Sequence, residues 1–331
     1  MKILVIGLGS IGKRHIKNLI KCGINPNNIA GIDPRLDRIS EVNKKFKIGK
    51  VINNLKKIKK KEFDAAIICS PTSLHVKQAL DLVKNHINIF IEKPLNHNLS
   101  GVSELKKLVK KNKLKVLITY PFRFSKHALK LKELVDKKIL GKIYFFRGIF
   151  SEYLPDWHPW ENYTSFYMAK KSLGGGSLLD QSHLIDMCHF LFGEVNEIKS
   201  CLNMKISDLK VDTDDLVNMN VKFKNGIHGN IHQDMIGRKH QKNLEIICKE
   251  GNILWDVYNL SVEVFYAKSK KVKIYKFGKD HNKMYENQTR HMIKIIRKIE
   301  KPKITLEDGI HTMKIIQNAK KSSNFGRKIK F

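Results

Sequence analysis

The stretch Met1-Lys-Ile-Leu-Val-Ile-Gly7-Leu-Gly9-Ser-Ile-Gly12-Lys-Arg-His15 decides the fold of this chain. An apolar segment leads directly into three glycines, and a helical pattern follows. In such a turn the first glycine permits a tight bend, the second lets a pyrophosphate approach the backbone, and the third lets the helix pack closely. The helix N-terminus then faces the phosphate charge. This context favours a dinucleotide-binding unit over a βα turn without a ligand. The residues expected at the phosphates are Gly7, Gly9, Ser10, Ile11 and Gly12.

Asp33 closes a second apolar segment, residues 29–33, at the distance from the turn that such a unit requires. A carboxylate there accepts hydrogen bonds from both ribose hydroxyls and repels a 2′-phosphate. The sequence therefore favours NAD as the cofactor. Arg35 lies two residues further and could cover the adenine or pair with a 2′-phosphate, so NADP stays possible.

The length of 331 residues suits two domains. Residues 1–120 alternate between short apolar runs and amphipathic patterns, which predicts a doubly wound parallel sheet with right-handed crossovers. Strands are expected at 2–6, 28–33, 64–69, 88–91 and 115–119. Helices are expected at 11–22, 35–46, 73–85 and 100–112.

Residues 121–331 predict a second, α+β domain with a large, mostly antiparallel open sheet, one face of which helices cover. Asn225-Gly226 is a strong hairpin signal, and Thr305-x-x-Asp308 is a capping box. Strands are expected at 142–152, 195–205, 214–223, 227–236, 243–249, 252–257, 261–266 and 272–277. Helices are expected at 125–137, about 177–192, 283–299 and 306–321.

The net charge of +32 could indicate nucleic-acid or membrane binding, but only nine of the 63 basic residues are arginine and the lysines are spread along the chain. We therefore expect no nucleic-acid partner, although an anionic substrate is compatible with this charge. No apolar run approaches the ~20 residues of a membrane helix. We also expect no signal peptide, because the first predicted strand begins at residue 2. The five widely spaced cysteines are typical of reduced thiols in the cytoplasm.

Two loops follow expected strands at the sheet edge where ligands bind in open α/β sheets. The first is Ser70-Pro71-Thr72-x-x-His75, which is also ordinary helix-capping chemistry. The second is Glu92-Lys93-Pro94. A lysine beside a nicotinamide can hydrogen-bond a substrate hydroxyl and stabilise the developing alkoxide, with Glu92 tethering it, although an isolated lysine is usually only solvated.

The segment from Gly174 to Asp186 combines a triple glycine with a helical pattern that carries Asp180 and His183. Three residues apart, these two lie on one helical face, and histidine is the natural proton acceptor near neutral pH. A structural helix is the alternative. A metal site of His183, Asp186 and His189 is not favoured, because the third position drifts around the helix, so we expect no metal.

An aromatic loop at residues 153–163 carries Trp157, His158 and Trp160. Aromatic faces suit sugar rings, but such loops are as often oligomer contacts or buried plugs.

In this order, the segments resemble the Gfo/Idh/MocA family of oxidoreductases over essentially the whole chain. The resemblance implies a Rossmann domain, an α+β domain whose sheet forms homodimers or homotetramers, a catalytic Lys93 and an acid/base His183 accompanied by Asp180. In many members the histidine follows the aspartate by four positions, whereas His183 follows Asp180 by three, so the chain departs from the family pattern at Asp180. The stretch around Trp157 is similar to a subgroup associated with bacterial surface-polysaccharide sugars. The residues and segments that carry the resemblance are Gly7–Gly12, Asp33, Ser70–His75, Glu92–Pro94, Arg123-Phe124 and Gly174–Asp186.

The resemblance assigns the residues to two groups. The cofactor-binding residues expected are Gly7, Gly9, Ser10, Ile11, Gly12, Asp33, Arg35, Ser70, Pro71, Thr72, His75, Glu92 and Lys93. The substrate-binding residues expected are Lys93, Arg123, Trp157, His158, Asp180 and His183.

The predicted activity is NAD-dependent hydride transfer between nicotinamide and a secondary alcohol of a sugar, cyclitol or sugar nucleotide. Two alternatives remain. One is a non-catalytic NAD(H)-binding regulator, which would not need Lys93, Asp180 and His183. The other is a lyase or glycosidase that oxidises its substrate only transiently with tightly held NAD.

Overall fold

The computed structural model describes residues 1–52, 54–157 and 159–331. The chain forms two compact units. The first comprises Met1–Pro121 and Tyr285–Met313, and the second comprises Phe122–Met284 and Lys314–Phe331. The segment Tyr285–Met313, which the sequence analysis placed with the second domain, therefore packs with the first.

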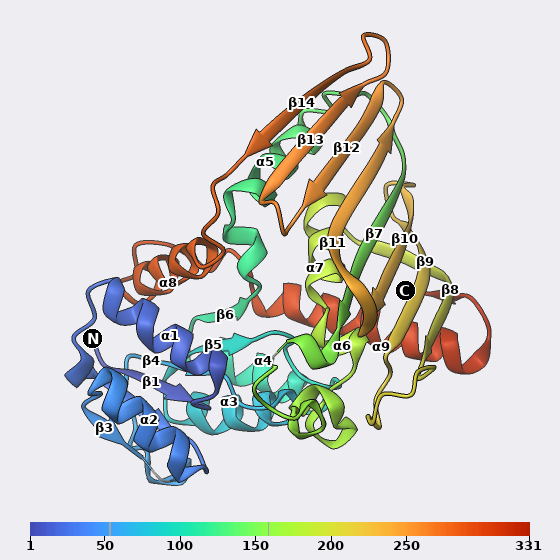
Figure 1. Cartoon of the computed structure of the whole chain (residues 1–331). Helices are drawn as coiled ribbons and strands as arrows, with labels where there is room; N and C mark the ends of the chain where they lie inside the picture. The colour runs from blue at the N-terminus through green and yellow to red at the C-terminus, as the bar shows by residue number, and fades with distance from the viewer. Residues whose placement is uncertain (53, 158) are drawn as a thin grey trace. The chain divides into compact units, whose positions relative to one another are not determined.

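A parallel sheet of six strands forms the centre of the first unit, in the order β3-β2-β1-β4-β5-β6 (Figure 1). This confirms the predicted doubly wound sheet. The chain reverses its direction of travel across the sheet between β1 and β4, and the carboxyl ends of strands at such a switch point form a ligand-binding crevice. The strands are β1 (Ile3–Ile6), β2 (Ile29–Ile32), β3 (Lys50–Val51), β4 (Ala65–Ile68), β5 (Asn88–Glu92) and β6 (Val116–Thr119). The short edge strand β3 was not predicted.

Amphipathic helices connect these strands (Figure 1). Helices α1 and α3 bury their apolar faces and contact β1 and β4–β5, respectively. Helix α1 contacts α2, and α3 contacts α4. The helices are α1 (Ser10–Lys21), α2 (Leu36–Phe46), α3 (His75–Lys84) and α4 (Val102–Lys111). Each lies within about two residues of its predicted bounds.

The segment Tyr285–Met313 adds most of α8 (Lys283–Ile296) and the first part of α9 (Leu306–Phe325) to the first unit. The Lys21 ammonium pairs with the buried carboxylate of Glu286. The N–H of Ile118 in β6 donates to the carbonyl oxygen of Ile304 at 3.2 Å. These contacts explain why the segment joins a sheet that is distant in sequence.

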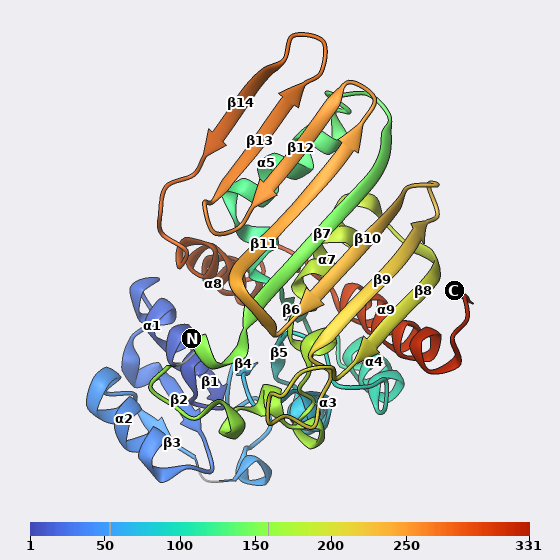
Figure 2. The same ribbon diagram turned by 45° about the vertical axis from the view of Figure 1, so that its right-hand side comes forward.

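A nine-stranded sheet dominates the second unit, in the order β14-β13-β12-β11-β7-β10-β9-β8-β15 (Figure 2). Every neighbouring pair is antiparallel except β7 with β10. The predicted mostly antiparallel sheet is therefore confirmed. Its strands are β7 (Ile143–Tyr153), β8 (Val195–Met204), β9 (Leu216–Phe223), β10 (His228–Asp234), β11 (Ile236–Cys248), β12 (Gly251–Asp256), β13 (Ser261–Tyr266), β14 (Lys271–Lys276) and β15 (Ile329–Lys330).

Helices α5 (Lys126–Asp136) and α7 (His183–Phe192) and the later part of α9 cover one face of this sheet (Figure 2). The core between helices and sheet is aromatic. The rings of Phe146 on β7 and Phe192 on α7 stack with centroids 4.7 Å apart, and Phe223 on β9 packs edge-on to both. Such offset and T-shaped contacts add to the burial of apolar area.

The predictions for the second unit missed β15 and the first seven residues of β11, Ile236 to Lys242, and one predicted helix is wrong. The single helix expected over about 177–192 is two helices, α6 (Ser177–Asp180) and α7, separated by Gln181 and Ser182. The side chain of Gln181 donates to the carbonyl oxygen of Asp234 at 2.9 Å, which holds the break against the end of β10. Within the described residues, no helix combines the length and the apolar character needed to cross a membrane.

Candidate functional site

The glycine turn after β1 allows other groups to approach its backbone closely. Gly7 has φ of +87° in the left-handed region, and its N–H donates to the carbonyl oxygen of Ile32 at 2.8 Å. A Cβ on Gly12 would lie 1.9 Å from the carbonyl oxygen of Gly7, so the packing of α1 on the turn requires glycine there. A Cβ on Gly9 would meet only the Arg38 guanidinium, at 3.7 Å. Packing within the protein therefore leaves room at Gly9, and the open backbone there fits a pyrophosphate.

Helix α1 begins directly at this turn. The N–H of Lys13 donates to the carbonyl oxygen of Gly9 at 2.9 Å, and Ser10 and Ile11 form the first turn. The N–H groups of a first helical turn lack intrahelical acceptors and lie at the positive end of the helix dipole. This end of α1 is therefore suited to an anionic group.

Asp33 follows β2 and is almost fully buried. Its Oδ2 accepts a hydrogen bond from the N–H of Leu8 at 2.7 Å, and its Oδ1 accepts one from the N–H of Arg35 at 2.9 Å. The guanidinium of Arg35, predicted to contact the cofactor, forms a two-bond pair with Asp37. Arg38 instead lies 3.6 Å from Asp33 and beside Gly9. Arg38 is thus the arginine that the structure brings to the glycine turn.

The loop after β4 leads from Ser70 through Pro71 into a 3₁₀ turn that begins at the buried Thr72. His75, the first residue of α3, is also buried, with Nε2 2.8 Å from the carbonyl oxygen of Ser70 and Nδ1 2.9 Å from that of Pro94. Burial lowers the pKa of His75, against the opposing effect of these carbonyls. A neutral imidazole donates to only one of them. The structure therefore gives His75 a supporting role between two loops.

Glu92 ends β5, and the half-buried Lys93 follows it. The Oε1 of Glu92 lies 2.7 Å from Nε2 of His15 on α1. Burial by itself raises the pKa of the Glu92 carboxyl, but the hydrogen bond with His15 and the nearby Lys93 ammonium together hold that pKa below its usual value. Lys93 thus follows the carboxyl end of β5, and its ammonium is near enough to act on a buried negative charge.

In the second unit, a glycine turn precedes α6. A Cβ on Gly175 would lie 2.3 Å from the carbonyl oxygen of Met168, and Gly176 has φ of +106°. The buried Asp180 ends α6, and its Oδ1 accepts a hydrogen bond from the hydroxyl of Tyr167. Asp180 and His183 were expected on one continuous helical face. The break at Gln181 and Ser182 places them on two different helices instead.

His183 is the first residue of α7 and is partly exposed. Its ring lies against Phe122, with centroids 4.8 Å apart. Phe122 in turn packs edge-on to Phe150 and Trp255, at 6.0 and 5.5 Å. The imidazole therefore rests on a buried aromatic cluster that limits its movement.

Arg123, predicted to bind substrate, has an internal partner. Its Nε and terminal nitrogen donate to the two carboxylate oxygens of Asp186 at 2.9 and 2.7 Å, and both side chains are buried. Nδ1 of His189 lies 2.9 Å from the carbonyl oxygen of Gly193. Asp186 and His189 therefore make polar contacts within the protein. The described residues contain no His/Cys/Asp/Glu group suited to a metal ion.

The aromatic loop packs on a small hydrophobic cluster. Trp157 is partly buried against it, whereas Trp160 is 75% exposed. His158, a predicted substrate-binding residue, lies outside the described residues. The buried members of the cluster are Leu154, Phe166, Met168, Ala169, Leu209, Val211 and Met235.

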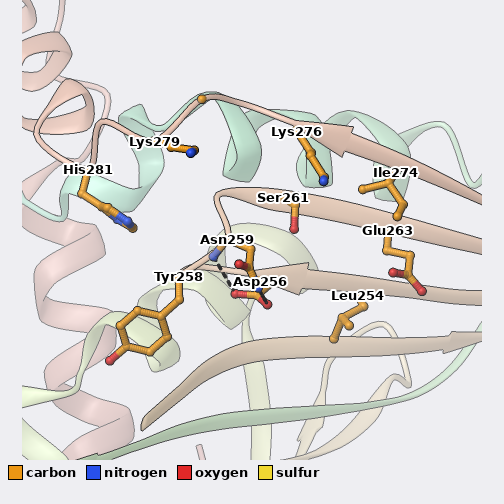
Figure 3. A pocket seen from close by; sticks show the side chains of 11 residues that line it. Leu254, Asp256, Tyr258, Asn259, Ser261, Glu263, Ile274, Lys276, Lys279 and His281 are labelled. Carbon is orange, nitrogen blue, oxygen red and sulfur yellow. Dashed lines mark hydrogen bonds between the residues drawn. The ribbon is translucent and has the colours of Figure 1, made fainter.

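A cavity of about 620 Å³ lies over β12, β13 and β14 (Figure 3). Asp256, Glu263 and Lys276 are among the side chains that line it. None of the predicted site residues is among the described residues that form its walls. The cavity is therefore separate from the candidate site.

Three residues at these sites were not predicted: Arg38, Tyr167 and Phe122. Arg38 follows Arg35 by three positions in a chain with few arginines, and this spacing could have indicated it. Phe122 contacts rings that are far along the chain, and Tyr167 contacts Asp180 across an irregular loop. No local sequence pattern indicates either contact.

Comparison with known proteins identifies both units. Residues 1–120 match the family model described as an oxidoreductase family with an NAD-binding Rossmann fold. Residues 128–254 match the model of the GFO/IDH/MocA C-terminal domain. Together the two models cover most of the chain.

Similar proteins span the full length of the chain. The myo-inositol 2-dehydrogenase of Thermotoga maritima is 27% identical, covering 100% of this chain and 98% of the relative. The NAD(+)-dependent scyllo-inositol 2-dehydrogenase of Bacillus subtilis is 23% identical, covering 95% and 92%. A levoglucosan dehydrogenase solved with NADH and levoglucosan has the same fold, with a TM-score of 0.86, 19% identity and coverage of 100% and 99%.

Proposed function

The chain belongs to the Gfo/Idh/MocA family of NAD-dependent oxidoreductases, and on this premise we propose that it oxidises a secondary alcohol of a sugar, cyclitol or sugar nucleotide to a ketone. The observation that carries the cofactor half of the proposal is the turn at Gly9, where the backbone is open, with the anchored carboxylate of Asp33 beside it. Bound NAD supplies the acceptor for the hydride that leaves the substrate carbon.

Lys93 and His183 handle the substrate oxygen. The Lys93 ammonium donates a hydrogen bond to this oxygen and stabilises the negative charge that develops as the hydride leaves. The His183 imidazole accepts the hydroxyl proton, so that the C–H and O–H bonds break and a C=O bond forms. The support for these roles is the place of Lys93 directly after β5, at the ligand-binding edge of the sheet, and the packing of His183 on Phe122.

Asp180 supports this chemistry as a buried charge. A carboxylate near a histidine favours the imidazolium that forms when the proton is taken up. The bond from Tyr167 satisfies one carboxylate oxygen of Asp180. Arg123 acts on the site indirectly, by holding Asp186 and thereby the first turns of α7.

The substrate class rests on chemistry and on relatives. The names of similar proteins specify myo-inositol, scyllo-inositol and levoglucosan, which are all ring compounds with secondary hydroxyls. Aromatic side chains such as Trp157 suit the apolar faces of such rings. The high positive charge of the chain also permits an anionic sugar, such as a sugar nucleotide.

We also propose a cytoplasmic protein that forms a homodimer or homotetramer through the large sheet of the second unit. Long paired strands with large apolar side chains exposed, including Leu202 and Ile274, support this assembly. Light scattering on the purified protein measures its mass directly, and a monomer would contradict it.

The first experiment mixes the purified protein with NAD and a panel of cyclitols, free sugars and sugar nucleotides, and follows the absorbance of NADH. We expect one class to give NADH with turnover. Binding of NADH without turnover on any compound would contradict the dehydrogenase and favour the regulator. Tightly held NAD and product formation without accumulation of NADH would favour the transient-oxidation lyase.

A further inference from the structure

We propose that Tyr167 is a positioning residue for the acid/base chemistry, because it holds the carboxylate of Asp180 in place. This inference rests on the proposed function and adds a residue to it. The hydroxyl of Tyr167 donates to Oδ1 of Asp180, whose side chain is buried. A buried carboxylate is stable only where donors satisfy its charge, and a bond to a charged group is stronger than one between neutral groups.

The backbone around Tyr167 is fixed to the glycine turn that precedes Asp180. The N–H of Gly176 donates to the carbonyl oxygen of Met168 at 3.0 Å. A Cβ on Gly175 would lie 2.4 Å from the carbonyl oxygen of Tyr167, so the two loops are in direct contact only because glycine stands there. The position of the phenol relative to α6 is therefore set by the backbone.

A second set of bonds ties the same loop to the segment before β9. The hydroxyl of Thr213 donates to the carbonyl oxygen of Met168 at 3.1 Å. The N–H of Asp212 donates to the carbonyl oxygen of Ala169, also at 3.1 Å. The Asp214 carboxylate accepts a hydrogen bond from the N–H of Leu178 in α6 at 2.8 Å. Tyr167 also packs on the hydrophobic cluster of the aromatic loop. Tyr167 and α6 thus share one rigid support.

This support matters because the helix is interrupted after Asp180. A continuous helix would fix Asp180 relative to His183 through its backbone hydrogen bonds. Here α6 has only four residues and ends at Asp180. The backbone bonds that cross the break from Ser182 to Leu179, at 3.4 Å, and from Leu184 to Gln181, at 3.1 Å, close three-residue turns instead of continuing the regular helical pattern. The bond from Tyr167 supplies a side-chain constraint at the position where regular helix is lost.

The test compares Tyr167→Phe with Tyr258→Phe. Each variant removes one hydroxyl that donates to a buried carboxylate, Asp180 in the first case and Glu152 in the second. With a substrate from the panel, we expect Tyr167→Phe to lower kcat on the order of 10- to 100-fold, with KM and the Kd for NADH within about twofold. Tyr258→Phe should keep the wild-type kcat. An equal kcat for both variants would overturn the inference.

A double variant tests whether Tyr167 acts through Asp180. If it does, adding Tyr167→Phe to Asp180→Asn lowers kcat no further, whereas independent roles would multiply the two losses and overturn the inference. Thermal unfolding of each variant shows whether it is folded at the assay temperature. Turnover by the wild type with an unaffected Tyr167→Phe overturns this inference alone. Absence of wild-type turnover overturns the proposed function, and the inference with it.

Discussion

Oδ2 of Asp33 accepts a hydrogen bond from the N–H of Leu8 at 2.7 Å, so the carboxylate is attached to the glycine turn itself. Its other oxygen is held by the N–H of Arg35 at 2.9 Å. The negative charge is therefore fixed before any ligand arrives. Fixed charge of this kind discriminates against a like-charged 2′-phosphate without needing to move.

Replacing Asp33 by asparagine should weaken this discrimination. Asparagine keeps an oxygen that can accept from the Leu8 N–H but carries no charge. We expect the preference for NADH over NADPH to fall on the order of 100-fold, because like charges at close range cost several kcal/mol. Fluorescence titration with both nucleotides measures the ratio. Glu104→Gln, which removes the same charge from α4, controls for net charge, and an unchanged ratio in Asp33→Asn would contradict the assignment.

Replacement of Gly9 and of Gly12 by alanine should have different effects on stability and on NADH binding. Gly9 has φ of −69°, and a Cβ there meets only the Arg38 guanidinium at 3.7 Å. Gly9→Ala should therefore leave the free energy of unfolding unchanged or raise it by up to about 1 kcal/mol, while it weakens NADH binding by filling the space of the pyrophosphate. Gly12→Ala should destabilise the protein by about 2 kcal/mol or more, since its Cβ would lie 1.9 Å from a carbonyl oxygen.

Urea denaturation and NADH titration of the two glycine variants separate these effects. Each variant serves as the control for the other. Normal NADH affinity in a folded Gly9→Ala protein would show that the turn does not contact the pyrophosphate.

Apart from the short edge strand β3, the strands and helices of residues 1–120 could be predicted closely because their signals are local: each apolar run is short and each helix has its own period. The contacts that shape the site are not local. Arg123 and Asp186 are 63 positions apart, and a sequence pattern cannot show that their charges neutralise each other. The break at Gln181 could not be predicted either, because the hydrogen bond that holds it joins the Gln181 side chain to the carbonyl oxygen of Asp234 at the end of β10.

The buried pair of Arg123 and Asp186 should be a large contributor to stability when only one partner is removed. Arg123→Ala leaves a buried carboxylate without its guanidinium, and we expect a loss of about 3–5 kcal/mol. The pair of the exposed Arg147 and the partly buried Glu245 provides the control, and Arg147→Ala should cost less than about 1 kcal/mol, because solvent screens the exposed guanidinium and Glu245 keeps its hydrogen bond from Asn252. All three tryptophans lie in the second unit, so their fluorescence during urea denaturation reports its unfolding. Equal losses in the two variants would contradict the structural role of Arg123.

His127 should make the second unit less stable in acid. Burial, with His281 nearby, lowers the pKa of His127 to about 4. Its Nδ1 accepts a hydrogen bond from the indole N–H of Trp255. Protonation of Nδ1 would replace this acceptor by a second N–H donor that faces the indole N–H. An unfolded histidine binds its proton near pH 6.5, so between about pH 6.5 and 4 the unfolded state holds more protons. The free energy of unfolding therefore falls as the pH falls through this range, by up to about 3 kcal/mol.

The variant His127→Asn tests this dependence. Asparagine retains an oxygen that can accept from Trp255 but does not titrate. Urea denaturation at pH 7 and pH 4.5 should show a smaller acid loss in His127→Asn than in the wild type. Parallel losses in the two proteins would assign the acid sensitivity to other groups.

Lys93 is the residue whose loss should separate binding from chemistry most clearly. Lys93→Ala removes the ammonium that stabilises the developing alkoxide, whereas the glycine turn and Asp33 are untouched. We therefore expect turnover to fall by about 100-fold or more, with the Kd for NADH little changed. Lys77→Ala, at an exposed position on α3 in the same unit, removes the same charge and should keep wild-type turnover. Steady-state rates with a panel substrate and NADH fluorescence titration supply both quantities. Wild-type turnover in Lys93→Ala would exclude it from the reaction, and a loss confined to NADH affinity would make it a cofactor-binding residue instead.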